Sequence, residues 1–487
     1  MKLLSEILYK TRIVQVIGGT NVAVEHISID SRSIRPMSLF VAIPGTTVDG
    51  HQYIPQCIKQ GAIAIVCERM PEELHPGVTY VQVNDSSEAL GYLSCNYYDH
   101  PSEKIKIVAV TGTNGKTTTA TLLYRLFRSM GLKTGLLSTV VNKINDTALE
   151  STHTTPNAIA LNELLCKMVD AGCTYCFMEA SSHALHQNRL TGIRLVGGLF
   201  TNITHDHLDY HGTFNEYIKA KKKLFDQLPA SAFAITNHDS KYGEIMLDHC
   251  KARHRSYGLK TMADYKARVL ENSFDGLHMQ LDGKEIYTRL IGSFNAYNLL
   301  LVYATGVELG IDKDQLLTTL SSLEAPAGRF EYLRSQTGII GIVDYAHTPD
   351  ALENVLHTLR DIRKGDQKII TLVGCGGDRD KTKRPEMARI AFEKSDRVIF
   401  TSDNPRSEQP EEILTQMLAG LSDAQKAQSL SLSDRKEAIK MACALAQAGD
   451  IVLVAGKGHE KYQEIAGIKY DFDDFSTLQE TLLNLNK

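Results

Sequence analysis

The chain has 487 residues, 43% of them hydrophobic and 23% charged, and its formal net charge is −4. This length exceeds what one hydrophobic core serves, and the negative charge argues against a general nucleic-acid-binding surface. No apolar run is long enough to cross a membrane, and the N-terminus lacks a signal-peptide core, so we expect a cytoplasmic protein.

Residues 1 to about 100 are predicted to form a small α/β unit. Runs of β-branched and aromatic residues predict short strands, and apolar residues at helical spacing predict two helices. The strands are expected at 27–30, 39–43, 62–67 and 79–83, and the helices at 54–60 and 87–98. Polar turns at 30–33 and 44–50 are the best ligand candidates here, but Ser, Arg and Gly are also ordinary turn residues.

A glycine-rich loop between a strand and a helix dominates the second unit, which runs from 101 to about 331. The loop reads TGTNGKTTT from Thr111 to Thr119 and follows a β-branched run. Its glycines let backbone N–H groups approach phosphate oxygens, and Lys116 and the helix N-terminus add positive charge. The hydroxyl of Thr117 can bind Mg²⁺. The strict consensus has glycine where this chain has Val110, but the strand, loop and helix together predict nucleotide binding.

Two later strands of this unit, at 175–178 and 196–201, lead into polar segments. Glu179 follows the first strand, at the edge where doubly wound sheets bind ligands, and in a nucleotide enzyme it is expected to hold Mg²⁺. The second leads into a His- and Asp-rich segment, 202–212, which suggests a metal. That segment nearly matches the HxHxDH signature of metallo-β-lactamase-type hydrolases, although Tyr210 shifts the register by one residue. A metal-dependent hydrolase is therefore an alternative.

The rest of the second unit is assigned by the same rules. We expect a strand at 134–140, a helix at 158–171 and a helix at 216–225 whose lysines form a solvated face. A strand at 233–236 precedes a less regular stretch with hairpins near 275 and 282, and a helix at 299–309 follows. Nine cysteines are scattered without framework spacing, so we expect them to be reduced.

The third unit, from about 332 to 487, repeats one pattern four times. Strands predicted at 339–343, 368–373, 398–401 and 451–454 each lead into a polar loop. Helical segments separate them, which indicates a Rossmann-like domain with all four loops at the carboxyl edge of one sheet. The glycines at 374–377 lack the spacing of a dinucleotide fingerprint, which argues against an NAD site.

Nine segments, taken in order, resemble the motifs of the Mur ligase family: TGTNGKTTT, MEASSH, TNITHDHLDYHG, GSFNAYN, GRFE, DYAHTPD, GCGGDRDKTKRP, TSDNPRSE and VAGKGHE. The resemblance spans all three units. It implies an α/β protein with a small N-terminal UDP-sugar domain (1–100), a central ATP-binding domain with a mostly parallel sheet (101–331) and a C-terminal Rossmann-like domain for the amino acid (332–487).

The resemblance also implies a reaction in peptidoglycan synthesis. A carboxylate of UDP-N-acetylmuramoyl-L-alanyl-D-glutamate takes the γ-phosphoryl group of ATP, and the amine of meso-2,6-diaminopimelate displaces phosphate from the acyl phosphate. Such a transfer between anions needs charge neutralisation and positioning above all. We expect a monomer that requires Mg²⁺ and ATP and binds neither nucleic acid nor membrane.

Roles for individual residues follow from the matched motifs. The resemblance implies that the catalytic residues are Lys116, Glu179, His207 and Lys221. It implies metal binding by Thr117, Glu179, His207 and Lys221, the last as a carbamate. The implied ATP-binding set is Gly112, Thr113, Asn114, Gly115, Lys116, Thr117, Thr118, Asn295, Arg329 and Asp344.

The two other substrates have their own implied sets. For the UDP-sugar dipeptide the set is Ile29, Ser31, Thr46, Thr47, Val48, Thr154, Thr155, Ser181, Gln187 and Arg189. For diaminopimelate it is Arg379, Asp403, Asn404, Pro405, Arg406, Gly456 and Glu460. His153 stands where the resemblance leads us to expect asparagine, so it is given no ligand role.

The choice of amino acid depends on one carboxylate. Diaminopimelate differs from lysine by a carboxylate on its distal carbon, which the guanidinium of Arg406 can bind bidentately. Glu460 is expected to pair with the distal ammonium. Three alternatives beside the hydrolase remain: the lysine-adding ligase of this family, a folylpolyglutamate synthetase, and a non-catalytic nucleotide-binding module. The folate enzyme normally has GTNGKGS in its phosphate loop and lacks the N-terminal domain.

Overall fold

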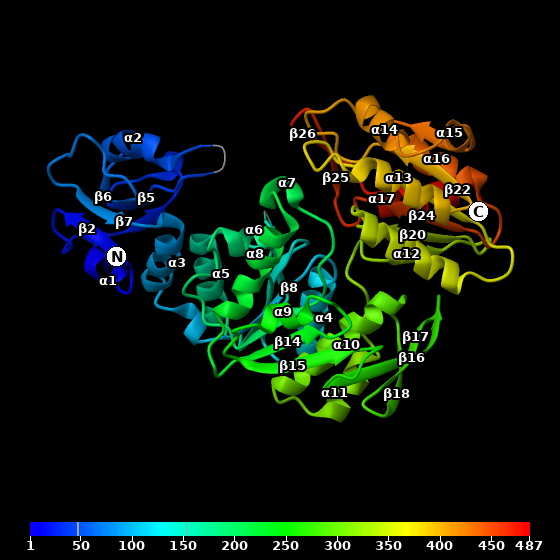
Figure 1. Ribbon diagram of the computed structural model, residues 1–487, viewed down its shortest axis with the longest axis horizontal. Helices are drawn as coiled ribbons and strands as arrows, with labels where there is room; N and C mark the ends of the chain where they lie inside the picture. The colour runs from blue at the N-terminus through cyan, green and yellow to red at the C-terminus, as the bar shows by residue number, and fades with distance from the viewer. Residues whose placement is uncertain (46–47, 152) are drawn as a thin grey trace.

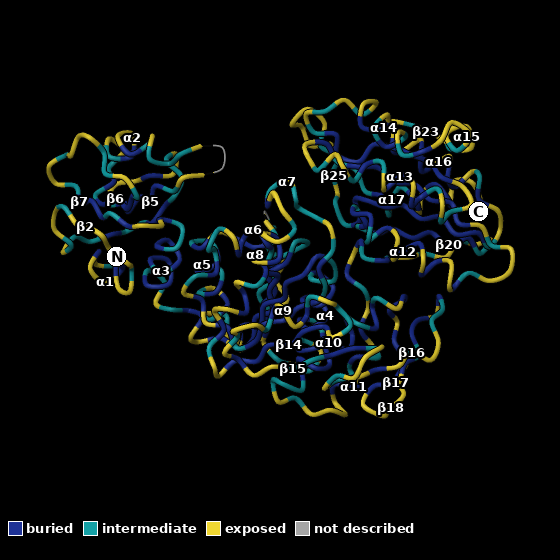
Figure 2. Tube along the Cα trace, in the orientation of Figure 1, coloured by how far each residue is buried: buried dark blue, intermediate teal, exposed yellow. Residues whose placement is uncertain are grey.

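The computed structural model describes residues 1–45, 48–151 and 153–487. Its strands form three main sheets that follow one another along the chain, and helices cover both faces of each. The N-terminal sheet (blue) and the C-terminal sheet (yellow to red) lie at opposite ends of the molecule (Figure 1). Figure 2 shows the buried chain concentrated in the sheets, with exposed residues mainly at turns. The predicted α/β class is confirmed.

The N-terminal sheet has five strands in the order β2-β7-β6-β5-β4. Their bounds are β2 (Ile13–Ile17), β4 (His26–Ser28), β5 (Ser38–Val41), β6 (Ala62–Cys67) and β7 (Thr79–Val83). Strands β7, β6, β5 and β4 are parallel to one another, so their carboxyl ends share one edge. Helices α1 (Leu4–Ile7) and α3 (Ser86–Tyr97) pack on one face and α2 (Ile54–Lys59) on the other. The sequence prediction missed β2, an edge strand.

The central sheet has eleven strands in the order β11-β10-β9-β12-β8-β13-β14-β15-β16-β17-β18. Its parallel part consists of β8 (Lys106–Thr111), β9 (Thr134–Leu137), β12 (Tyr175–Glu179), β13 (Gly197–Phe200), β14 (Phe233–Asn237) and β15 (Arg253–Gly258). Because helices cover both faces, these strands are nearly continuous apolar runs. The predicted hairpins near 275 and 282 are confirmed as β16 (Tyr265–Ser273), β17 (Gly276–Leu281) and β18 (Lys284–Thr288).

Two apolar cores hold helices against the central sheet. One contains α4 (Lys116–Ser129), α10 (Ser293–Glu308) and α11 (Lys313–Leu320). The other contains α5 (Ala158–Asp170), α6 (Ser182–His186), α8 (Phe214–Asp226) and α9 (Gly243–Leu247). The phosphate loop lies between β8 and α4, as predicted, so a buried strand and a buried helix fix its two ends.

The C-terminal sheet has the order β19-β20-β24-β21-β22-β23. Its strands are β19 (Glu331–Arg334), β20 (Ile340–Asp344), β21 (Ile369–Val373), β22 (Arg397–Thr401), β23 (Leu430–Leu432) and β24 (Ile451–Ala455). Strands β20, β24, β21 and β22 are parallel, which confirms that their four polar loops lie at one edge. Helices α12 (Pro349–Ile362), α13 (Lys383–Lys394) and α14 (Pro410–Leu418) cover one face, and α16 (Arg435–Leu445) and α17 (Asp474–Asn484) the other.

Shorter elements complete the fold. They are β1 (Lys2–Leu3), β3 (Ala23–Val24), β10 (Asn142–Ile144), β11 (Thr147–Leu149), α7 (Leu208–His211), α15 (Asp423–Gln428) and the hairpin β25 (Tyr462–Ile465) and β26 (Ile468–Asp471). The sequence prediction missed this hairpin, which lies beside the loop after β22. Among the described residues, no helix is both long and apolar enough to cross a membrane.

Candidate active site

The phosphate loop, residues 111–118, depends on its two glycines. Gly112 has φ +150° and Gly115 has φ +86°. A Cβ on Gly112 would lie 1.9 Å from Oγ1 of Thr201, and one on Gly115 would lie 2.7 Å from Oδ1 of Asn298. Thr201 donates its hydroxyl to the carbonyl of Asn114 at 2.6 Å, which ties the loop to the end of β13. The loop is therefore held in place by its neighbours.

Two lysines point their ammonium groups at carbonyls of this loop. Nζ of Lys116 donates to the carbonyls of Gly112 at 3.0 Å and Thr113 at 2.8 Å, and Nζ of Lys221 donates to the carbonyl of Gly112 at 2.7 Å. Lys221 is only 1% exposed. Burial, with the charge of Lys116 second, holds the pKa of Lys221 well below its usual value. Among the described residues no carboxylate bonds to either lysine, so positive charge is gathered at the loop.

Glu179 faces the start of α4. It is the last residue of β12 and fully buried, so the sequence prediction that placed it just after the strand is corrected by one residue. Its Oε2 accepts the hydroxyl of Thr117 at 3.0 Å, and its Oε1 accepts the backbone N–H of Thr139 at 2.7 Å. A carboxylate and a hydroxyl are hard oxygen donors of the kind that Mg²⁺ binds, so the pair fits this metal.

His207 lies at the N-terminus of α7 with φ +54°. Its Nε2 is 3.4 Å from Oδ2 of Asp206, and its ring is 4.8 Å from that of His183. Burial lowers the pKa of His207 more than the charge of Asp206 raises it, so the imidazole is neutral and able to accept a cation. Within the described residues, no three His, Cys, Asp or Glu side chains are arranged to hold a metal ion together, as the hydrolase alternative would need.

The segment before the C-terminal sheet reaches the phosphate loop. Nη2 of Arg329 donates to Oγ1 of Thr117 at 3.1 Å, and the guanidinium stacks on the Tyr345 ring at 4.5 Å. Asp344 accepts the N–H of Phe330 at 2.6 Å, and burial, opposed by the charge of Arg329, raises the pKa of Asp344 to about 6. Arg329 therefore links Thr117, at the start of α4, to Tyr345, which follows β20 of the C-terminal sheet.

Asn295, the remaining predicted ATP residue, lies in the first turn of α10 and is 2% exposed. Its Oδ1 accepts Nδ2 of Asn298 at 3.0 Å, and Asn298 is the residue beside Gly115. The predicted ATP-binding residues are thus joined by contacts through Asn298, Thr117 and Arg329.

The residues predicted for the UDP-sugar dipeptide fall into two groups. In the first, Thr155 donates to the carbonyl of Glu179 at 2.8 Å and accepts the N–H of Ser181 at 3.1 Å. Arg189 donates to the carbonyl of Thr155 at 2.7 Å and to Oε1 of Gln187 at 3.0 Å. The hydroxyls of Thr139 and Thr154 are hydrogen-bonded, so Thr154 belongs to the same group.

The second group belongs to the N-terminal sheet. Ile29 and Ser31 follow β4, and Val48 follows β5 and is half exposed, so these residues lie at the carboxyl edge of that sheet. Thr46 and Thr47 lie outside the described residues.

The residues predicted for diaminopimelate gather after β22 and β24. Asp403, Asn404 and Pro405 are buried, and Asn404 donates to Oε2 of Glu460 at 2.7 Å. A Cβ on Gly456 would lie 2.4 Å from Oδ2 of Asp403, so the two loops are in close contact.

Arg406 keeps part of its guanidinium available. Its Nη1 donates to the carbonyl of Gly377 at 2.7 Å, and its Nε lies 3.6 Å from Oε2 of Glu464. In the described part of the chain, Nη2 of Arg406 has no hydrogen-bond partner. Arg379 is exposed, and both arginines approach Gly376, whose Cβ would lie 2.9 Å from Nη1 of Arg406 and 3.8 Å from Cγ of Arg379.

Comparison with known proteins agrees with this geometry. The family models "Mur ligase family, catalytic domain", "Mur ligase middle domain" and "Mur ligase, glutamate ligase domain" match residues 23–98, 110–306 and 328–458. A Cytophaga hutchinsonii protein named UDP-N-acetylmuramoyl-L-alanyl-D-glutamate--2,6-diaminopimelate ligase is 56% identical over 99% of this chain and 100% of its own length. The chain belongs to the Mur ligase family. A Bacteroides fragilis protein of the same name is 51% identical over 98% of each chain.

Solved structures agree on the architecture of this Mur ligase. A structure titled as a UDP-N-acetylmuramoyl-L-alanyl-D-glutamate--2,6-diaminopimelate ligase matches with a TM-score of 0.70 and 31% identity, over 100% of this chain and 99% of that one. A folylpolyglutamate synthase from Mycobacterium tuberculosis matches with a TM-score of 0.62 and 17% identity, over 76% of this chain and 92% of that one. The second likeness shows a shared fold alone.

Two side chains of this Mur ligase's site were missed from the sequence. Tyr345 lies under Arg329, and Lys457 lies fully buried between Asn404 and Glu460. Both stand in motifs whose other members were singled out, DYAHTPD and VAGKGHE. Their position in a loop at the carboxyl edge of the sheet was the available signal.

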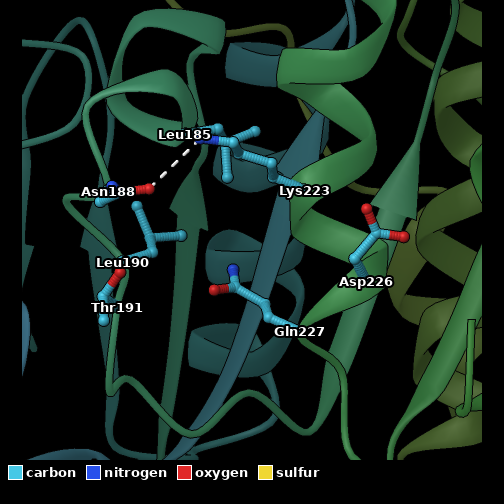
Figure 3. A pocket seen from close by; sticks show the side chains of 7 residues that line it. All are labelled: Leu185, Asn188, Leu190, Thr191, Lys223, Asp226 and Gln227. Atoms are coloured by element: carbon cyan, nitrogen blue, oxygen red, sulfur yellow. Dashed lines mark hydrogen bonds between the residues drawn. The ribbon is translucent and has the colours of Figure 1, made fainter. Parts of the chain in front are cut away.

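A cavity of about 230 Å³ lies beside α6 and α8 in the Mur ligase (Figure 3). It is lined by Leu185, Asn188, Leu190, Thr191, Lys223, Asp226 and Gln227. Lys223 contacts Asn188 at 3.3 Å, whereas Lys221, two residues earlier in α8, bonds to the phosphate loop. Residues two apart point to different sides of a helix, so the cavity lies on the other side of α8 from the loop.

Proposed function

We propose that this Mur ligase joins meso-2,6-diaminopimelate to UDP-N-acetylmuramoyl-L-alanyl-D-glutamate, with ATP consumed through an acyl phosphate. Relatives with that printed activity match the chain over nearly its whole length. The main support for the proposal is that Arg329 contacts both Thr117 of the phosphate loop and Tyr345, which follows β20 in the sheet that bears the amino-acid loops. The substrates therefore meet between two parts of one chain.

The three sheets support a division into three domains. We place the UDP-sugar domain at 1–100, the ATP domain at 101–331 and the amino-acid domain at 332–487. Each range contains one main sheet with its own apolar cores. Since every substrate site then comes from a single chain, we propose that the enzyme works as a monomer. We place it in the cytoplasm, where ATP is available.

In the proposed ATP site, Lys116 and the loop N–H groups neutralise the β- and γ-phosphates. Thr118 and Asn295 line the same site, Arg329 and Asp344 complete it from the C-terminal side, and Thr117 and Glu179 would hold Mg²⁺. Bound there, Mg²⁺ would neutralise charge on the phosphate oxygens during transfer. The neutral ring of His207 would hold a second Mg²⁺.

Lys221 is proposed to act as a carbamate. The ammonium first loses a proton to solvent. The amine then forms an N–C bond as one C=O π bond of carbon dioxide opens, and a second proton leaves to solvent, so that a cation becomes an anion able to help hold the second metal. Its burial and its bond to the carbonyl of Gly112 support this, since a buried ammonium that no carboxylate among the described residues contacts is costly.

Substrate binding is divided between the other loops. The UDP-sugar would bind at the N-terminal sheet edge through Ile29, Ser31 and Val48, with Thr46 and Thr47 in the same segment. The muramoyl dipeptide would bind along Thr154, Thr155, Ser181, Gln187 and Arg189, where Arg189 supplies a cation that bonds to the neutral oxygens of Gln187 and Thr155.

The amino acid is proposed to bind between the loops after β21, β22 and β24. Arg379 is positioned to bind the carboxylate beside the reacting amine, and the free Nη2 of Arg406 the distal carboxylate. Glu460, with Asp403, Asn404 and Gly456 around it, would bind the distal ammonium. Without a distal carboxylate, lysine would leave Arg406 unpaired, which favours diaminopimelate.

The test is ADP release by the full chain with Mg·ATP and the UDP-muramoyl dipeptide, with either meso-diaminopimelate or L-lysine. The proposal expects release with diaminopimelate and little with lysine. Release with lysine alone would keep the ligase reaction and overturn the role of Arg406. Absence of release with either amino acid would overturn the proposed function.

A further inference from the structure

Lys457 is a buried cation in the proposed amino-acid site. It follows Gly456 in the loop after β24, and its side chain is 0% exposed. Its Nζ lies 3.1 Å from Oε2 of Glu460 and 3.0 Å from Oδ1 of Asn404. Lys457 thus contacts the carboxylate that the proposed function assigns to the distal ammonium of the substrate.

The two oxygens of Glu460 have different surroundings. Oε2 accepts both Nδ2 of Asn404, at 2.7 Å, and Nζ of Lys457. Oε1 is 3.5 Å from the hydroxyl of Tyr345 and has no closer partner among the described residues. Asn404 cannot turn to another partner, because its Oδ1 also accepts the N–H of Glu464 at 2.9 Å. Lys457 therefore fixes the carboxylate and leaves Oε1 for a ligand.

The charge of Lys457 also acts on whatever binds there. A buried charge is weakly screened, so it repels an ammonium that approaches Oε1 and attracts a carboxylate nearby. A substrate side chain that ends in a lone ammonium is repelled by Lys457 and has no carboxylate for Lys457 to attract. An end that carries both an ammonium and a carboxylate offsets the repulsion with attraction to Lys457 and Arg406.

We propose that Lys457 is a specificity-determining residue, whose buried positive charge disfavours amino acids ending in a lone ammonium and favours those whose distal end also carries a carboxylate. This inference rests on the proposed function and adds a residue that acts against the wrong amino acid. Arg406 stabilises a bound distal carboxylate, whereas Lys457 destabilises a bound ammonium that has no carboxylate beside it.

The test uses Lys457→Met in the full chain and three amino acids whose distal ends differ in charge. They are meso-diaminopimelate (ammonium and carboxylate), L-2-aminopimelate (carboxylate alone) and L-lysine (ammonium alone). In Lys457→Met, the ratio of kcat/KM for diaminopimelate to that for lysine should fall about tenfold or more, and the ratio for aminopimelate to lysine should fall further. The KM for ATP should stay within about twofold.

Lys461→Met is the matched control. Lys461 lies four residues later, is 67% exposed and pairs with Asp473 rather than with Glu460. This variant should leave all three ratios unchanged. Equal losses for the three amino acids in Lys457→Met would mean a structural role alone and would overturn the inference.

The wild-type protein gives a second measurement, in case Lys457→Met does not fold. It should use aminopimelate with a higher kcat/KM than lysine, although aminopimelate cannot pair with Glu460. A preference for lysine would overturn the inference. If the wild-type protein releases no ADP with any of the three, the proposed function fails and this inference fails with it. Turnover of diaminopimelate with unchanged ratios in the variant would overturn the role of Lys457 only.

Discussion

The phosphate loop and the amino-acid loops (403–406 and 456–460) both surround buried or half-buried cations, but they balance them differently. Lys116 and Lys221 bond to backbone carbonyls, and Arg329 to a threonine hydroxyl. Among the described residues, no ion pair joins any of these three to a carboxylate. Around the amino-acid loops, by contrast, fully buried side chains of Lys457, Arg384 and Arg435 each pair with a carboxylate, those of Glu460, Glu408 and Asp474.

The difference matches the charge of what each site is proposed to receive. The uncompensated cations Lys116 and Arg329 favour an anion such as a nucleotide phosphate, which supplies the missing negative charge, whereas Lys221 would lose its positive charge as a carbamate. A site whose fully buried cations are already paired gains little from a lone ion and suits a zwitterionic group. The comparison therefore separates a site built for charge neutralisation from a site built for discrimination.

The largest effect is expected from Lys116→Met, which removes a cation that bonds to backbone carbonyls and that a nucleotide phosphate would balance. We expect kcat to fall about 10³-fold, because the developing charge on the phosphoryl group loses a fixed partner. Steady-state ADP release measures it. Lys219→Met is the control, since Lys219 is 71% exposed and pairs with Glu216 on α8. Activity within about tenfold of wild type would contradict the proposed role of Lys116.

The next effect concerns Lys221. Replacement by alanine removes the amine that would carry the carbamate, and kcat should fall about 10²-fold. Added bicarbonate should not restore activity, because no amine remains at that position. ADP release measured with and without bicarbonate tests both points. Full activity of Lys221→Ala would remove the carbamate hypothesis.

A smaller and more selective effect is expected at Arg406. Arg406→Ala should raise the KM for diaminopimelate about 30-fold, because the distal carboxylate would lose its charge-assisted hydrogen bonds. The KM for ATP should change little, and the exposed Arg397, at the start of β22, supplies the control Arg397→Ala. Equal rises in both KM values would show that Arg406 is not specific for the amino acid.

The smallest effect is expected on the free energy of unfolding, when the carboxylate paired with buried Arg384 is replaced. Glu408 accepts Nη1 and Nη2 of the fully buried Arg384 at 2.8 and 2.9 Å, and this bonding is the main reason that its pKa lies at about 2, below the ordinary 4.5. A lowered pKa gives stability that is present above pH 4.5 and lost as the pH falls toward 2.

Glu408→Gln should therefore lower the free energy of unfolding by about 2 kcal/mol at pH 7. The gap between variant and wild type should narrow between pH 4.5 and 2, as urea unfolding at several pH values would measure. A gap that stays constant over this range would contradict the ion-pair explanation.

The phosphate loop could be predicted from the sequence because its signals are local. A β-branched strand, two glycines and Lys116 lie within a dozen residues, and the structure places them as predicted. The four loops of the C-terminal sheet were also predictable, since strands that alternate with helices run parallel and end at one edge. The residues named in those loops followed from the motifs.

Pairing over long sequence separations could not be predicted. Arg435 opens α16 and reads as an exposed helix start, yet it donates to both oxygens of Asp474, 39 residues later, at 2.8 and 2.7 Å. It also donates to the carbonyls of Ser402 and Ala455 at 3.1 Å, where the amino-acid loops begin. Lys457 was missed for the same reason: its partners depend on how two loops pack.

A competition reaction compares the two amino acids in a single experiment. The full chain is given Mg·ATP, the UDP-muramoyl dipeptide and equal concentrations of meso-diaminopimelate and L-lysine, and the two products are separated by mass. Their early ratio equals the ratio of the two kcat/KM values. We expect the diaminopimelate product to be in excess by about 10²-fold, because Arg406 attracts the distal carboxylate and Lys457 repels the lone ammonium of lysine. Equal amounts, or an excess of the lysine product, would contradict it.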